Sequence, residues 1–301
     1  MKLNNNFLFF SKIIVIFSLF FYLIKNDFID FKILIFNESN QYLFILLIII
    51  LSSITILISA FRWYLIMKMF EFKINLKNVI FITYIGAIFN NFLFGAYGGD
   101  LVKGYYILKG NKDKKILLGS TILIDRFFGL IGLSIIAAAF IYQIFKIEIN
   151  ILANNLLNNF FFYILFIALF LLIILYLLIK FSNFSPMFKK IIKLIIFCLP
   201  LSIFLFLIVN FIVYLITNVI FNFDINFNSV FLSNSLTSFV NAIPVTPGGV
   251  GFGELAYVKI LDMINDANNL EGLATVIVFF RIINFISSLP GLYFYMVFKK
   301  I

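Results

Sequence analysis

The stretch that decides the fold is residues 43–67, LFILLIIILSSITILISAFRWYLIM, which carries one charged side chain, Arg62, in 25 positions. A helix rises about 1.5 Å per residue, so this stretch is longer than the ~30 Å of hydrocarbon in a bilayer. Its apolar residues form a continuous run rather than an alternating one, which is typical of a spanning helix and not of a barrel strand. The sequence therefore predicts an all-α integral membrane protein.

The composition of the whole chain agrees with this prediction. Of 301 residues, 63% are apolar and 12% are charged, whereas soluble domains have about 45–50% apolar and 25% charged residues. This excludes a soluble enzyme, a nucleic-acid-binding domain and a disordered chain. The chain has no histidine and one cysteine, Cys198, so we expect no histidine-based catalysis, no metal site, no internal disulfide and no cofactor.

The apolar segments fall into two kinds. Six are long enough to span a membrane: 7–24, 43–67, 116–145, 156–180, 191–221 and 272–298. Two others, 78–97 and 228–247, are rich in Asn, Ser and Thr and run into glycine-rich loops. Irregular backbone at membrane depth survives only where protein or water covers it, so we interpret these two as re-entrant helical hairpins.

The lysines predict the orientation of this arrangement. With six spans and two hairpins that do not cross, fifteen lysines lie on one side and four on the other. The four are Lys25, Lys32, Lys146 and Lys259. The positive-inside rule then places both termini in the cytoplasm. The net charge of +10 is explained by these loops and by attraction to anionic lipid, without a nucleic acid.

The two halves of the chain, about 43–145 and 191–298, share a pattern. Each has a glycine pair, an acid and, 26 or 27 residues after the acid, an arginine. These residues are Gly98, Gly99, Asp100 and Arg126 in the first half, and Gly248, Gly249, Glu254 and Arg281 in the second. The predicted spans of the two arginines run in opposite directions, which is an inverted repeat. Transporters built this way bind their substrate near the midplane between the repeats.

The three arginines stand out against twenty lysines. A guanidinium holds phosphate or carboxylate with two parallel hydrogen bonds and keeps its charge. Arg126 and Arg281 are candidates for binding a substrate or gating its path, whereas Arg62, near the end of its span, is expected to snorkel to the surface. Asp125 either neutralises Arg126 or Arg281 as a structural ion pair, or couples transport to a proton or Na⁺.

The glycine loops allow two interpretations. Glycines let backbone N–H groups approach an anion at a helix N-terminus, or they serve tight packing at the hairpin tips. Asp100 and Glu254 cap helices, pair with a membrane arginine, or bind a cationic headgroup. Asn90 and Asn241, near the hairpin tips, complete the set of substrate-binding candidates.

Three motifs carry a resemblance to a known family. They are residues 90–104, the DRFFG of residues 125–129, and the PVTPGGVGFGE of residues 244–254. Together they resemble the transmembrane, flippase-like family of lysylphosphatidylglycerol synthases. The family residues matched here are Gly98, Gly99, Asp100, Asp125, Arg126, Pro247, Gly248, Gly249, Glu254 and Arg281. The resemblance implies movement of a phospholipid between leaflets, and related membrane regions accompany glycosyltransferases of lipid-linked sugars. We expect no synthase activity, because the soluble catalytic domain is absent.

Residues 1–301 are therefore expected to form a single polytopic domain of the inner membrane that translocates a phospholipid or lipid-linked headgroup through a central cavity. Without an ATP-binding motif, movement would be downhill or ion-coupled. The alternatives are a secondary transporter of a small solute or ion, and a membrane-embedded enzyme of lipid or lipid-linked sugar metabolism. The expected partners are the lipid itself, further copies of the chain in a homo-oligomer, or a separate lipid-modifying enzyme.

Overall fold

The computed structural model describes residues 18, 21–30, 39–92, 98–108, 115–149, 186–242, 246, 249–264 and 270–298, and this part of the chain is helical without strands. The long helices are α2 (Ser39–Met69), α5 (Lys115–Ile149) and α7 (Pro186–Leu215), which continues as the π-helical turn η3 (Ile216–Ile220). The shorter ones are α3 (Leu76–Phe92), α4 (Gly98–Leu108), α8 (Phe227–Ala242), α9 (Phe252–Met263), α10 (Leu273–Ser288) and α11 (Pro290–Phe298).

Four stretches of helix are long and apolar enough to cross a membrane. They are Gln41–Met69, Ile116–Gln143, Ile192–Ile220 and Leu273–Met296. Four of the six predicted spans are thereby confirmed as helices of spanning length. The predicted span at 156–180 lies outside the described residues, as does most of 7–24. The outward faces of these helices are apolar, as Leu43, Ile116 and Leu123 illustrate, which fits a multi-pass membrane protein.

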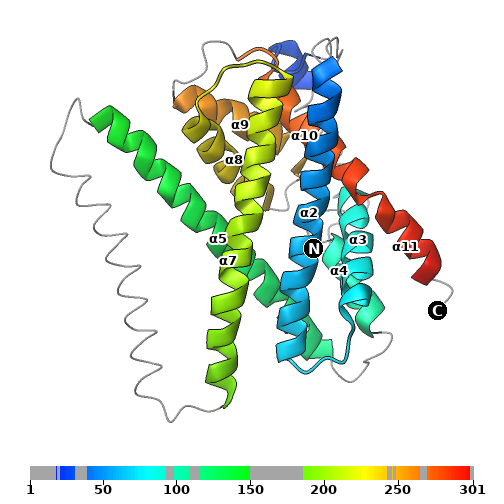
Figure 1. The fold of residues 1–301 in the computed structure, drawn as a ribbon. Coiled ribbons are helices and arrows are strands. Elements are labelled where there is room, and N and C mark those ends of the chain that lie inside the picture. The colour runs from blue at the N-terminus through cyan, green and yellow to red at the C-terminus, as the bar shows by residue number, and fades with distance from the viewer. Residues whose placement is uncertain are drawn as a thin grey trace, which may run out of the picture.

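The centre of the fold is the contact between α2 and α7, which run in opposite directions (Figure 1). In Figure 1, α2 begins at the top and α7 begins at the bottom. Helix α5 rises through the view, whereas α10 and α11 descend. Pro290 has no N–H to donate and marks the boundary between α10 and α11.

Two short helices pack together in each of the pairs α3–α4 and α8–α9. In Figure 1 the α8–α9 pair lies near the top of the molecule and the α3–α4 pair lies lower, on the right. Their packing is reciprocal. Helix α5, which follows the first pair, contacts α8 of the second, and α10 and α11, which follow the second pair, contact α3 of the first. The two halves therefore interlock, and Asn90 at the end of α3 and Asn241 at the end of α8 line one cavity between them.

The start of α10 is held by a segment near the beginning of the chain. Gly272 and Ala274 donate their backbone N–H groups to the carbonyls of Asp27 and Phe28 at 2.8 and 2.9 Å. The first N–H groups of a helix have no partner within it, so this segment satisfies part of that need. Phe28 also packs into the apolar core formed with α7, α9 and α10. These contacts therefore fix the N-terminal end of α10, the helix that carries Arg281.

Candidate functional site

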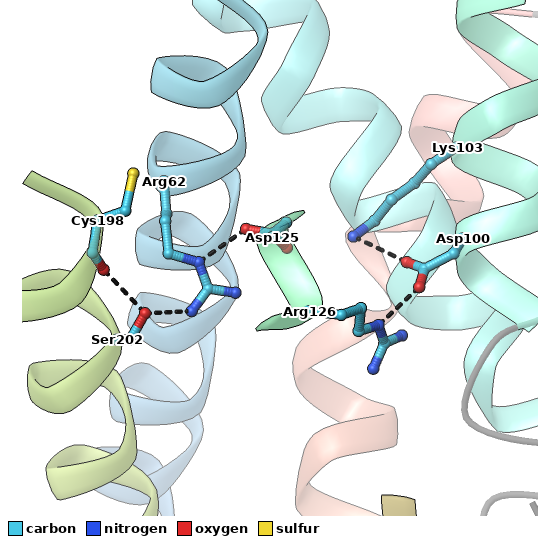
Figure 2. A network of polar contacts seen from close by, with 7 residues as sticks. All are labelled: Arg62, Asp100, Lys103, Asp125, Arg126, Cys198 and Ser202. Carbon is cyan, nitrogen blue, oxygen red and sulfur yellow. Dashed lines mark hydrogen bonds and ion pairs between the residues drawn. The ribbon is translucent and has the colours of Figure 1, made fainter. Parts of the chain in front are cut away.

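The first polar cluster lies where α4 begins beside α5. Asp100, in the first turn of α4, is 8% exposed. Arg126 of α5 donates from Nε to Asp100 Oδ2 at 2.6 Å, and Lys103 places Nζ 3.5 Å from Oδ1 (Figure 2). Lys103 also lies over the buried ring of Trp63, 5.2 Å from its centre, a favourable cation–π geometry. One acid therefore faces two cations, and the Arg126 side chain remains 37% exposed.

The second cluster repeats this arrangement between α9 and α10. Glu254, in the first turn of α9, is fully buried. Arg281 donates from Nε to Glu254 Oε1 at 2.7 Å and from Nη2 to Oε2 at 3.3 Å. Glu254 Oε2 also accepts the backbone N–H of Gly251 at 2.8 Å. Glu254 thus both caps its helix and holds the arginine, which the sequence had left as separate interpretations.

An asparagine supports each cluster from the end of the preceding helix. Asn90 of α3 accepts the backbone N–H of Gly99 at 2.7 Å. Asn241 of α8 accepts from Arg281 Nη2 at 3.4 Å, and the carbonyl of Gly249 accepts from the same nitrogen at 2.9 Å. The first cluster thus brings together four predicted site residues, Asn90, Gly99, Asp100 and Arg126. The second brings together Asn241, Gly249, Glu254 and Arg281. Gly98 begins α4, while Pro247 and Gly248 lie outside the described residues.

The contacts of the third arginine, Arg62, show that two expectations were wrong, the snorkelling of Arg62 and the partner of Asp125. Arg62 does not snorkel, because its side chain is 7% exposed and donates from Nε to Asp125 Oδ1 at 2.7 Å. Its Nη1 also donates to Ser202 of α7 at 2.8 Å (Figure 2). Asp125 therefore pairs with Arg62 and not with Arg126 or Arg281. This buried contact ties α2, α5 and α7 together.

A cavity of about 430 Å³ opens between these helices. One part of its wall is polar and includes Arg62, Lys103, Asp125, Arg126, Asn90 and Asn241. Another part is apolar and includes Ile56, Leu130, Leu133, Leu205 and Phe206. A smaller cavity of about 140 Å³ lies beside Arg281. Each arginine of the repeated clusters thus lines a cavity of its own.

The comparison with known families identifies the family of the chain. The model of the family described as "Lysylphosphatidylglycerol synthase TM region" matches residues 9–291. The chain belongs to this family. No curated protein and no solved structure matches it significantly. This family is described as a membrane region, which is consistent with a lipid-related and non-catalytic transmembrane role.

Some residues of this family member's site were missed from the sequence. Lys103 follows Asp100 by three positions in one helix, a spacing at which side chains meet. This spacing could have predicted the contact between the two residues. Ser202 lies in an apolar run, and no pattern in the sequence connects it with Arg62. The glycines, by contrast, were anticipated in part: their tight-packing role is confirmed at Gly99.

Replacing Gly99 by alanine is expected to lower the thermal stability of this family member. An added Cβ would collide with the carbonyl of Gly86 and would lie 2.7 Å from the Asn90 side chain. Overpacking of this kind costs about 1–3 kcal/mol. Gly104→Ala in the same helix is the matched control, because the nearest atom to its Cβ would be 3.8 Å away. Thermal unfolding in detergent compares the two, and equal midpoints would contradict the prediction.

Proposed function

We propose that this protein translocates a phospholipid or lipid-linked headgroup across the bilayer, with the headgroup in the 430 Å³ cavity and the acyl chains in lipid. The observation that carries the proposal is the mixed wall of this cavity. A lipid presents a charged headgroup joined to apolar chains, and the cavity places guanidinium and amide groups beside leucine and phenylalanine side chains. A small hydrophilic solute would gain nothing from contact with the apolar part of the cavity wall.

The charges favour an anionic group such as a phosphate. Three cationic side chains, Arg62, Lys103 and Arg126, lie in the cavity wall. Asp125 and Asp100 oppose them, which leaves one net positive charge. Arg126 is the most accessible candidate for a ligand because 37% of its side chain is exposed. Its guanidinium has the geometry that a phosphate prefers.

The inverted repeat and the re-entrant hairpins belong to the same proposal. Helices α2 to α5 and α7 to α11 follow the same order of long helix, short pair and long helical stretch, in opposite directions (Figure 1). Helix α4, with 11 residues, is about 17 Å long and too short to cross the hydrocarbon. The lysine distribution supports cytoplasmic termini in an inner membrane.

A translocation assay tests this proposal. Proteoliposomes carrying a fluorescent phospholipid in both leaflets lose fluorescence in dithionite beyond the outer-leaflet fraction if the protein moves lipid. We expect Arg126→Ala to slow this phase about tenfold or more, since hydrogen bonds to charged groups contribute about 1.5–3 kcal/mol. Lys68→Ala, at an exposed lysine at the end of α2, is the control and should match the wild type.

Two outcomes would contradict the proposal. One is bleaching of the wild-type proteoliposomes only to the level of protein-free vesicles, and the other is translocation of lipid by Arg126→Ala at the wild-type rate. Substrate-dependent current in the absence of lipid movement would instead support a transporter of small solutes.

A further inference from the structure

The two repeated clusters differ at the position three residues after the acid. In the first cluster this residue is Lys103, whose Nζ lies 3.5 Å from the Asp100 carboxylate. In the second, the residue three positions after Glu254 is Tyr257, which is fully buried and whose hydroxyl lies 3.0 Å from that of Thr217. The first cluster therefore has an ammonium group where the second has a neutral phenol.

The neighbouring helices leave a fitted space for the Lys103 side chain. A Cβ on Gly86 of α3 would lie 2.9 Å from Lys103 Cε and 3.0 Å from its Cγ, so the glycine leaves the room through which the lysine stem runs. The ammonium group then lies over the ring of Trp63. The side chain is 11% exposed and lines the 430 Å³ cavity. Lys103 is therefore built into the cavity wall and is not a mobile surface charge.

The charge of Asp100 is balanced by Arg126 rather than by Lys103. Arg126 Nε lies 2.6 Å from Asp100 Oδ2, a short charge-assisted hydrogen bond, whereas Lys103 Nζ lies 3.5 Å from Oδ1 (Figure 2). The second distance is longer than the range of about 2.7–3.2 Å that is typical of N–H···O hydrogen bonds. The ammonium of Lys103 is thus the surplus positive charge of the cavity wall.

The same wall offers little to a headgroup that carries an amine. Among the described residues that line the cavity, Asp125 is the sole carboxylate, and it accepts a hydrogen bond from Arg62 at 2.7 Å. A headgroup ammonium would therefore face the like charge of Lys103 without an acid left to pair with it. Like charges repel more strongly in a partly buried site than in water. A phosphate without an amine would instead meet an ammonium of opposite sign.

We propose that Lys103 determines which headgroups this protein accepts, by favouring lipids whose headgroup is net anionic over zwitterionic and aminoacylated ones. The inference rests on the proposed function for the lipid nature of the ligand. Within that function it assigns separate roles to the two cations at Asp100. Arg126 holds the phosphate that all phospholipids share, and Lys103 discriminates between headgroups by their total charge.

A comparison of lipids tests the role of Lys103. The dithionite assay is run with acyl-labelled phosphatidylglycerol, phosphatidylcholine and lysyl-phosphatidylglycerol, and the rates are compared within each variant. We expect the wild type to move phosphatidylglycerol about tenfold faster than the other two lipids, the size of one charge-assisted hydrogen bond. Lys103→Met keeps the length of the stem and leaves Asp100 paired with Arg126, so the ratio of rates should fall to about one. Lys103→Arg retains the charge and should keep the ratio, as should Lys68→Met at the exposed end of α2.

Native mass spectrometry measures the same preference without transport. Purified wild type and Lys103→Met are each mixed with equal amounts of the three lipids, and we expect phosphatidylglycerol to be enriched in the wild type alone. Equal rates for all three lipids, faster movement of lysyl-phosphatidylglycerol, or an unchanged ratio in Lys103→Met would overturn the role of Lys103 and leave lipid translocation standing. Selective retention that depends on Lys103, without movement of any lipid, would instead support the selectivity and reject the translocase.

Discussion

Replacing Glu254 by alanine is expected to remove about 3–5 kcal/mol from the free energy of unfolding, the range found when one partner of a buried ion pair is deleted. Glu254 is fully buried and holds Arg281 with both carboxylate oxygens. Its loss would also leave the N–H of Gly251 without its acceptor. The expected result is a large drop in the midpoint of thermal unfolding, measured by the monodisperse fraction remaining after heating in detergent.

The same helix provides the control. Asp262 forms an ion pair with Lys259 at 3.5 Å, but both side chains are nearly half exposed. Surface pairs of this kind contribute about 0–1 kcal/mol, so Asp262→Ala should shift the midpoint little. If Glu254→Ala were as stable as Asp262→Ala, the Glu254–Arg281 pair would not be a structural element of the fold.

The second large effect is expected at the pair of Arg62 and Asp125. Arg62→Met and Asp125→Leu should each destabilise the protein by about 3–5 kcal/mol, because each leaves one charge buried without its partner. The double variant should recover most of this loss, since both charges are then absent and the replacements fill a similar volume. A double variant as unstable as the sum of the single ones would show that the two residues act independently.

The double variant also separates the two interpretations of Asp125. If the pair is purely structural, a stable Arg62→Met/Asp125→Leu protein should translocate lipid with the pH and Na⁺ dependence of the wild type. If Asp125 takes up a proton or Na⁺, that dependence should disappear in the double variant and in Asp125→Asn. The measurement is the dithionite-sensitive rate at several pH values, with and without Na⁺.

The sequence singled out the residues of the two repeated clusters, because a glycine pair, an acid and an arginine recur at matching spacing in both halves. The pairing of each acid with its arginine was one of several interpretations left open. Asp100 and Glu254 each begin a short helix after a glycine loop, and each arginine follows 26 or 27 residues later. The acid and the arginine occupy matching positions in the two halves of the bundle. If they form an ion pair in one half, the same pair is therefore expected in the other. The long helices were predictable for a simpler reason, since their apolar runs are longer than the hydrocarbon is thick.

The pair of Arg62 and Asp125 was not predictable in this way. A position along a span gives the depth of a side chain but not the direction in which the helix turns it. Arg62 lies seven residues before the end of α2, close enough for a long side chain to reach the surface, and the sequence does not show that α5 brings Asp125 beside it. A central cavity was expected, but most of the residues that line it were not, because its wall is assembled from six helices.

The order of the charges along the chain has a consequence for synthesis. Asp100 precedes Arg126, and Glu254 precedes Arg281, so each of these arginines emerges when its acid has already been made. Arg62 emerges 63 residues before Asp125 and must enter the bilayer without it, at a cost below the value of about 2.5–3.5 kcal/mol that holds at the centre of a spanning helix. Its span offsets this cost with a mean hydropathy of 2.9, the highest among the four. Among these four stretches, the one with the highest mean hydropathy is therefore the one that has to insert a charge before its counter-ion exists.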